Sequence, residues 1–153
     1  MQIELKGLQK INAKLQELEE NLVNTRPLVG ELTNHLYNLI EESFETQTTP
    51  DGKSWSPIKK ATHKNYGLST DKILYKTGHM RNSLYHYSVI GGGGAVGVNA
   101  TAKGYMYPLV HQYGSKFVEA RPFMPIKADG ELYEGTQREL DEIMEEWFTL
   151  QIS

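Results

Sequence analysis

The sequence predicts an α+β fold in which an antiparallel sheet, with a hairpin at residues 85–99, is flanked by N-terminal helices and a C-terminal helix. Apolar residues recur at helical spacing before residue 45 and again after residue 130. Between these segments the period changes to two, on either side of the run from Gly91 to Gly94. Strand periodicity enclosed by helical periodicity therefore indicates a mixed fold.

The length and composition suit one compact domain. The chain has 153 residues, of which 39% are hydrophobic and 23% charged, so it can bury a single core. It has no uninterrupted apolar run of about 18 residues. Its start, MQIELKGLQK, lacks the apolar core of a secretory signal, so we expect a soluble cytoplasmic product with no membrane partner. The absence of cysteine excludes disulfides, thiolate zinc sites and thiol catalysis.

Two amphipathic helices are predicted at the N-terminus. The first has its apolar residues at alternating spacings of three and four, on one narrow stripe formed by Leu8, Ile11, Leu15, Leu18 and Leu22. We therefore expect residues 1–24 to form a helix that stands partly clear as an arm, and residues 25–153 to form a single domain. The second helix opens at Arg26-Pro27 with Thr25 as its cap, and its apolar face continues to Phe44.

The middle of the chain predicts loops and two short helices. Turn residues in TQTTPDGKSWSP mark an exposed loop, which Trp55 closes by packing back on the core. Ser56 is predicted to cap a short helix over residues 58–65, with Pro57 at its first position. Thr77 is predicted to cap a second one whose apolar members are Met80 and Leu84.

The hairpin and the C-terminal part follow. The glycine run resembles a phosphate cradle, but a strand comes after it and not a helix with Lys-Ser or Lys-Thr, which argues against phosphate binding. We expect a helical turn over residues 105–113, interrupted by Pro108 and ended by Gly114, and then a strand over residues 116–119. The final helix is predicted from about Gly130 onward.

The formal charge of -3 conceals a division along the chain. Residues 1–52 carry four Lys or Arg against nine Asp or Glu, residues 53–81 carry seven against one, and residues 82–153 carry five against nine. The basic middle is either a solvated face that complements the acidic helices of its own fold, or a charged interface for an acidic neighbouring subunit or for phosphates. Its basic residues are Lys53, Lys59, Lys60, Lys64, Lys72, Lys76 and Arg81.

The stretch from Tyr107 to Ile126 holds the most distinctive motifs, His111-Gln112-Tyr113-Gly114 and Arg121-Pro122-Phe123-Met124-Pro125. A catalytic loop would gather nucleophiles, carboxylates or metal ligands, whereas this one gathers aromatics, prolines and an arginine. Such a composition is typical of a shaped contact surface. Aromatic residues and arginine are common interface anchors, so Trp55, Arg121 and Phe123 either fix the loops of a subunit contact or are buried within one subunit.

Catalysis, metal binding and cofactor binding are not predicted. None of the five histidines lies in a recognised ligand spacing, and no nucleophile elbow accompanies a Ser-His-Asp order. A metal-dependent hydrolase that uses His79, His86 and His111 is an alternative that bound metal would reveal. His111, beside Gln112, is more typical of a hydrogen-bonded structural residue than of a base.

Four motifs occur in a fixed order: Asp51-Gly52 with Trp55-Ser56-Pro57, Leu74 to Gly78 with Arg81 to Leu84, His111 to Gly114, and Arg121 to Met124. Together they resemble the phage virion morphogenesis family, the tail completion proteins of contractile-tailed phages and prophages. Each motif alone is weak, but four with compatible gaps make the resemblance specific, from about residue 30 to the C-terminus. The chain departs from the family pattern at Pro125, where the family has glycine.

The resemblance implies a non-enzymatic assembly protein that completes the head-proximal end of the tail, so that head and tail can join. It also implies a homo-oligomeric ring, with six copies as one option, that meets the tail tube or tail terminator and head connector proteins and lies near phage DNA in a channel. Such a protein would reside in the host bacterial cytoplasm during assembly and then in the virion, with no cofactor and no small-molecule substrate.

A ring needs two different complementary surfaces on each copy, and an acidic flank and a basic centre supply them. The residues that we predict at subunit or partner interfaces are Trp55, Lys59, Lys60, Lys64, Arg81, His111, Gln112, Tyr113, Gly114, Arg121, Pro122 and Phe123. The alternative is a DNA-binding module that uses the basic segment 53–81, where Trp55, Tyr66 and Tyr75 are interleaved with cations.

Overall fold

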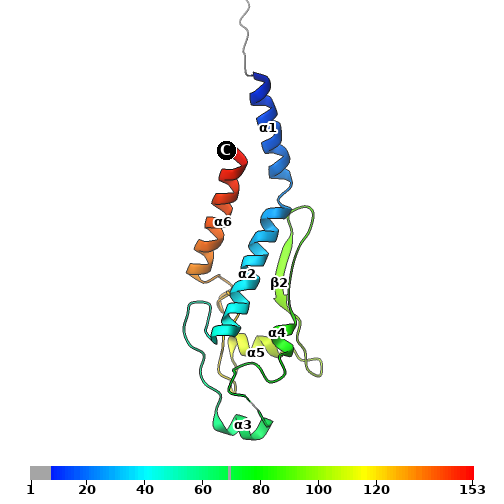
Figure 1. Ribbon diagram of the computed structural model, residues 1–153. Helices are drawn as coiled ribbons and strands as arrows, with labels where there is room; N and C mark the ends of the chain where they lie inside the picture. Colours follow the sequence, from blue (N-terminus) through cyan, green and yellow to red (C-terminus); the bar gives the residue numbers. More distant parts are fainter. Residues whose placement is uncertain (1–7, 69) are drawn as a thin grey trace, which may run out of the picture.

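A computed structural model describes residues 8–68 and 70–153. Its long helix α2 (Arg26–Thr46) is the element against which the hairpin and the C-terminal helix pack. The hairpin of β1 (Leu84–Ser88) and β2 (Gly94–Val98) packs along one side of α2, and α6 (Glu134–Ile152) packs along another (Figure 1). His35 of α2 supports the second contact, since its Nε2 lies 2.9 Å from Glu139 Oε2 of α6. The predicted arrangement of a hairpin between N-terminal helices and a C-terminal helix is confirmed.

The sheet has two antiparallel strands in the described part of the chain. Leu84 pairs with Val98 at one end and Ser88 with Gly94 at the other, so the hairpin begins and ends one residue before the predicted bounds. Gly94 lets the sheet approach α2 closely, because a Cβ there would lie 2.5 Å from Val29 Cγ1. A small residue at this position therefore sets the distance between sheet and helix.

The core lies at the lower end of α2 as drawn in Figure 1. Phe44 is at its centre, with ring centroids 5.8 Å from Trp55 and 5.2 Å from Phe123. These rings pack with Ile40, Met80 and Ala100, all of which are buried. Aromatic pairs at these distances add to the stability that apolar burial provides. The prediction that Trp55 packs back on the core is confirmed.

Helix α1 (Leu8–Val23) extends beyond the top of α2, where it contacts α6 (Figure 1). Much of its apolar stripe is uncovered, since Ile11 is 58% and Leu15 57% exposed. The two predicted N-terminal helices thus form, with a break at Asn24-Thr25. Thr25 occupies the N-cap position of α2, as predicted, although its side chain makes no cap hydrogen bond.

The two short helices differ from their predicted starts. Helix α3 is Lys60–Tyr66 with Lys59 at its N-cap, because the Ser56 hydroxyl donates a hydrogen bond to Glu119 (2.7 Å) rather than capping a helix. Helix α4 is His79–Asn82, with Gly78 at the cap position in the left-handed region (φ 69°). Leu84, expected in that helix, belongs to β1.

Three predictions for the C-terminal part also need correction. Pro108 lies in the first turn of α5 (Tyr107–Tyr113), where a proline does not interrupt a helix. Residues 116–119 form a turn in which the Val118 backbone N–H donates to Ser115 Oγ (3.1 Å), and not a strand. Helix α6 begins at Glu134 rather than near Gly130, since Leu132 is bridged to Ile126.

Candidate assembly interface

Gln112 joins the two distinctive motifs into one unit. Its side chain is buried in α5, where Oε1 accepts hydrogen bonds from the backbone N–H groups of Phe123 (3.0 Å) and Met124 (2.9 Å). Its Nε2 donates to the carbonyls of Met124 (3.2 Å) and Ile126 (2.9 Å). Proline has no backbone N–H and is excluded from the interior of a sheet, so this amide supplies hydrogen bonds that a sheet cannot give to residues 123–126.

Arg121 and Trp55 fasten the loop at residues 55–57 to the same unit. Arg121 Nε donates to the Ser56 carbonyl (2.8 Å) and Nη2 donates to that of Pro57 (3.2 Å). In the opposite direction, Trp55 Nε1 donates to the Pro122 carbonyl (2.8 Å). Two loops far apart in the sequence are thereby fixed against each other. We call this assembly of residues 55–57, α5 and residues 119–126 the loop clamp.

The loop clamp contains seven of the predicted interface residues, listed here in chain order: Trp55, His111, Gln112, Tyr113, Arg121, Pro122 and Phe123. Gly114 follows directly as the C-cap of α5. Trp55 and Phe123 are 5% and 1% exposed, so the structure places both inside the subunit. Tyr113, by contrast, is 45% exposed at the end of α5. Any interface at the loop clamp is therefore formed by its outer residues, and the buried anchors hold those residues in position.

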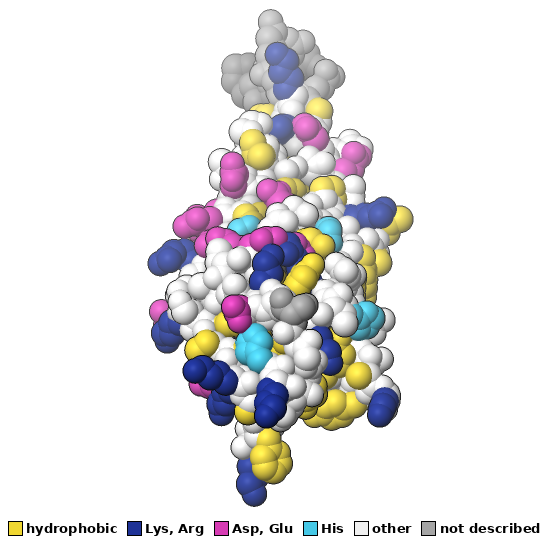
Figure 2. All heavy atoms as spheres, turned by 60° about the horizontal axis from the view of Figure 1, so that its bottom comes forward, with side chains coloured by type: hydrophobic (Ala, Val, Ile, Leu, Met, Phe, Trp, Pro, Cys, Tyr) yellow, Lys and Arg dark blue, Asp and Glu magenta, His cyan; other side chains and the backbone are white. Residues whose placement is uncertain are grey.

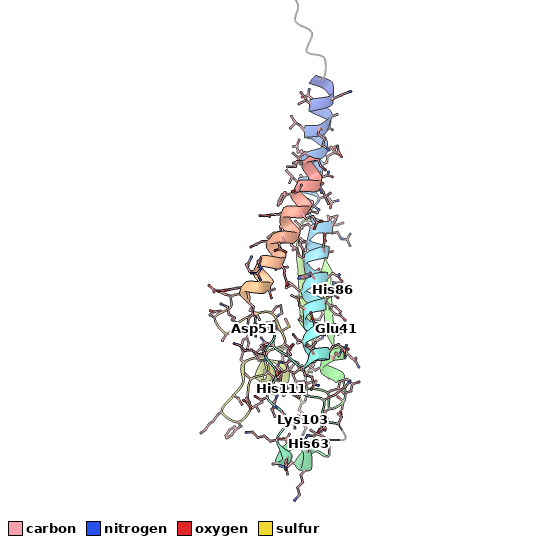
Figure 3. The ribbon with its side chains drawn as sticks, turned by 60° about the vertical axis from the view of Figure 1, so that its left-hand side comes forward. Glu41, Asp51, His63, His86, Lys103 and His111 are labelled. Carbon is pink, nitrogen blue, oxygen red and sulfur yellow. The ribbon has the colours of Figure 1, made fainter. Side chains whose placement is uncertain are left out.

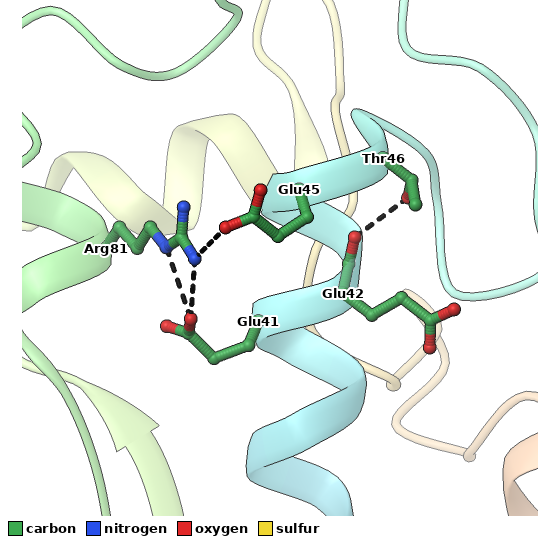
Figure 4. A network of polar contacts seen from close by, with 5 residues as sticks. All are labelled: Glu41, Glu42, Glu45, Thr46 and Arg81. Carbon is green, nitrogen blue, oxygen red and sulfur yellow. Dashed lines mark hydrogen bonds and ion pairs between the residues drawn. The ribbon is translucent and has the colours of Figure 1, made fainter.

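Arg81 lies apart from the loop clamp and is already paired within the subunit. Its Nη2 donates to Glu41 Oε2 (2.8 Å) and also to Glu45, two carboxylates one turn apart on α2 (Figure 4). The hydrogen bonds that Arg81 donates to Glu41 and then to Glu45 raise the pKa of Arg81. The structure thus uses this cation to attach α4 to α2.

The predicted lysines lie on or beside α3 and are all exposed: Lys59, Lys60 and Lys64. Two further lysines contact aromatic rings in the same part of the chain. Lys72 Nζ lies 5.2 Å from the ring centroid of Tyr75, and Lys76 Nζ lies 5.2 Å from that of Tyr66. With the α3 end turned forward, Figure 2 shows Lys and Arg side chains around the lower part of the molecule and most Asp and Glu side chains above them. We call the region that carries Lys59, Lys60, Lys64, Lys72 and Lys76 the basic end.

A cavity of about 720 Å³ opens between the basic end and the loop clamp. Its walls come from the segments around α3, from α5 and from residues 117–121, and they are largely apolar. Of the residues that line it, Leu68, Ile73 and Phe117 were not predicted as site residues, and Leu74 was named only in a family motif. Phe117 is an aromatic residue in a polar turn, and this feature of the sequence could have indicated the cavity. In the structure its side chain is 86% exposed.

The histidines do not converge on a catalytic centre. Figure 3 shows His86 beside α2, His111 at α5 and His63 near α3, spread along the molecule. Among the described residues, no group of three or more His, Asp or Glu side chains is placed to hold a metal ion. Burial, and then the charge of Arg121, lower the pKa of His111, whose Nδ1 is buried without a hydrogen-bond partner.

Residues 6–145 match the phage virion morphogenesis family. The chain belongs to this family. The match extends to the N-terminal helix α1, about 24 residues beyond the limit set by the motifs alone. This phage virion morphogenesis protein is also similar to the Mu-like prophage FluMu G protein 1 of Haemophilus influenzae, with 27% identity over 147 residues that cover 89% of this chain and 92% of that protein. No solved structure matches the chain at a significant level.

Membership assigns this phage virion morphogenesis protein to a family of structural proteins of phage assembly. The family resemblance stated from the four motifs is confirmed. In the described part of the chain, none of the helices combines the length and apolar character needed to cross a bilayer. The interface residues named from the sequence remain predictions, because the structure contains one copy of the chain.

Proposed function

We propose that this protein is a non-enzymatic assembly factor that completes the head-proximal end of a phage tail for head–tail joining, as a homo-oligomeric ring. The observation that carries the proposal is the opposite charge of two regions of one elongated subunit. The basic end exposes Lys59, Lys60 and Lys64 beside α3, whereas the outer face of α6 exposes Asp141, Glu142, Glu145 and Glu146. Two different, complementary surfaces on each copy are what a closed ring requires.

Family membership supports the proposal, since these are proteins of virion morphogenesis. In this proposal the ring contacts the tail tube or tail terminator on one side and head connector proteins on the other. It forms in the host cytoplasm and remains in the virion near the channel for DNA. The loop clamp gives each copy a rigid surface, because its hydrogen bonds fix loops that would otherwise have to be ordered on binding.

Loss of the protein tests the proposal directly. In particles made without it, we expect filled heads and separate tails, with few joined virions. Tails assembled with a Lys59→Glu, Lys60→Glu variant should also give a reduced yield of infectious particles. Normal numbers of joined virions in the absence of the protein would contradict the proposal.

One feature favours the second candidate, a DNA-binding function of residues 53–81. Tyr66 and Tyr75 are 62% and 42% exposed beside Lys76 and Lys72, as in proteins that stack bases next to cations. This candidate requires binding of duplex or single-stranded DNA with a steep dependence on salt concentration. No binding at two salt concentrations would leave the assembly function as the better explanation.

A further inference from the structure

The cavity beside the basic end has an apolar floor that continues from the core. Ile73 and Leu74 line it and also pack against the buried cluster around Phe44. At its rim, Tyr66 and Phe117 are 62% and 86% exposed. Large apolar side chains so open to water around a concave site are typical of a surface that is covered in an assembly.

The rim of this cavity is positively charged. Lys59, Lys72 and Lys76 line it, and all three are exposed. Among the described lining residues the one carboxylate is Glu119, which accepts a hydrogen bond from Ser56 Oγ (2.7 Å). Close by, Asp71 lies 3.3 Å from His63 Nε2. The excess of cations favours an occupant with acidic groups next to apolar ones.

The last turns of α6 carry such a surface. Asp141, Glu145, Phe148 and Ile152 follow one another at spacings of four, three and four, so they lie on one face of the helix. All are exposed, with Phe148 at 47% and Ile152 at 66%. No lysine or arginine occurs after Arg138. Two apolar side chains at the end of the helix thus follow two carboxylates, in a part of the sequence without lysine or arginine.

Within one subunit these two surfaces cannot meet. Figure 1 shows α3 at the bottom of the molecule and the end of α6 in its upper half, and the view in Figure 3 agrees. A contact between them therefore needs two copies, each of which donates its α6 end to one neighbour and its cavity to the other. Repetition of such a contact gives a ring when the rotation closes.

We infer that the cavity receives the end of α6 from a neighbouring copy, with Phe148 and Ile152 on the apolar floor and Asp141 and Glu145 beside the lysines of the rim. This helix-in-groove contact rests on the proposed ring and specifies its subunit interface. Because both surfaces are exposed in the single subunit, variants in them should fold normally.

Charge reversal tests the pairing. Lys72→Glu with Lys76→Glu, or Asp141→Lys with Glu145→Lys, should weaken association roughly tenfold or more, as measured by sedimentation of the protein alone or by retention on purified tails. An equal mixture of the two reversed proteins should regain association, because the reversed cavity of one matches the reversed α6 end of the other and their unchanged surfaces also match. One chain with both reversals should regain association as well. No recovery in the fourfold variant would overturn the charge pairing.

Cross-linking tests proximity, because the chain has no cysteine. Thr62→Cys places a thiol at the cavity wall and Thr149→Cys places one next to Phe148. Mixed in equal amounts, free or assembled on tails, the two variants should form a cross-linked heterodimer with a short bis-maleimide. Thr46→Cys is the matched control for position 149, since each threonine is exposed and each hydroxyl donates to the carbonyl four residues earlier at 2.8 Å. It should give no cross-link to position 62.

Three results would overturn the inference: no cross-link either free or on tails, links between like positions instead, or a link from position 62 to another virion protein. Particles that lack the protein separate this failure from that of the proposed function. If they still fail to join heads and the 62–149 link is absent, the completion function stands and only the interface is wrong. If the link forms but joining is normal without the protein, the proposed function is wrong.

Discussion

Gln112 shows how much one side chain can contribute when it is buried with all its polar groups satisfied. Its amide makes four hydrogen bonds to the loop at residues 123–126, two as donor and two as acceptor. Gln112→Leu keeps the apolar volume but leaves buried backbone groups without partners. Each of these four groups costs about 1–3 kcal/mol, so we expect a loss of at least about 4 kcal/mol in the free energy of unfolding, measured with urea.

Gln137 provides the matched control for this prediction. It lies on the exposed face of α6, where its Nε2 donates to Asp141 Oδ1 (2.9 Å). Gln137→Leu should change the free energy of unfolding by no more than about 0.5 kcal/mol. Equal effects of the two substitutions would show that Gln112 does not hold the loop clamp together.

His111 gives the second prediction at this scale, a dependence of stability on pH. Burial, and then repulsion from Arg121, lower its pKa from the ordinary 6.5, so the unfolded chain binds a proton more readily than the native protein does. The stability is therefore fully present above pH 6.5 and is lost as the pH falls through the lowered pKa of the native protein. The loss can reach about 1.4 kcal/mol per pH unit for one proton.

Denaturation of wild type and His111→Gln at several values between pH 7.5 and pH 5 measures this contribution. The variant should show a flatter dependence, because the glutamine side chain does not titrate. His79→Gln is the control, since His79 is exposed on α4. Identical pH profiles of wild type and His111→Gln would rule out the contribution of this histidine.

At the scale of single elements, the hairpin depends on Gly94. A Cβ there would lie 2.8 Å from the Tyr87 carbonyl oxygen and 2.5 Å from Val29 of α2, so alanine must push the sheet away from the helix. We expect Gly94→Ala to destabilise the protein by about 1–3 kcal/mol. Gly135→Ala in α6, with no atom within 4 Å of the added Cβ, should instead stabilise by up to about 1 kcal/mol. Thermal unfolding of both variants measures the contrast.

Local patterns predicted the long elements well and the short ones less well. The apolar periods of α1 and α2 and the alternation around Gly91 identified both helices and the hairpin, because these signals repeat over many residues. Ser56 was expected to cap a helix, but its hydroxyl bonds Glu119, a residue 63 positions away. Partners so distant in sequence leave no local signal.

The same reason limits what the sequence reveals of the candidate site. The two motifs were identified separately from the sequence, but not the bond between them, which Gln112 of the first motif makes to the backbone of the second. The pairing of Arg81 with Glu41 could not be predicted, because 40 positions separate the two residues. Nor could the cavity, which forms only when the segments around α3 meet α5 and the turn at Phe117.

For the whole molecule, the distribution of apolar contacts separates stability from assembly. The buried cluster around Phe44 belongs to residues 40–123, whereas α1 contacts α6 and leaves Ile11, Leu15 and Leu22 more than two-fifths exposed. Charge is divided in a similar way, with basic residues beside α3 and acidic ones along α6. Regions that contribute little to the core of one subunit are thus the ones available to other subunits.

This separation leads to a prediction for a protein that begins at Thr25. Without residues 1–24 it should still unfold in one cooperative transition, because Ile40, Phe44 and their buried neighbours all remain. Its melting temperature should fall by no more than about 8 °C, the change that about 1 kcal/mol produces in a domain of this size or smaller. If the uncovered stripe of α1 also serves assembly, the shortened protein will bind tails more weakly than its stability explains. Calorimetry and tail binding on the same preparation distinguish the two effects, and loss of the cooperative transition would show that α1 is part of the domain.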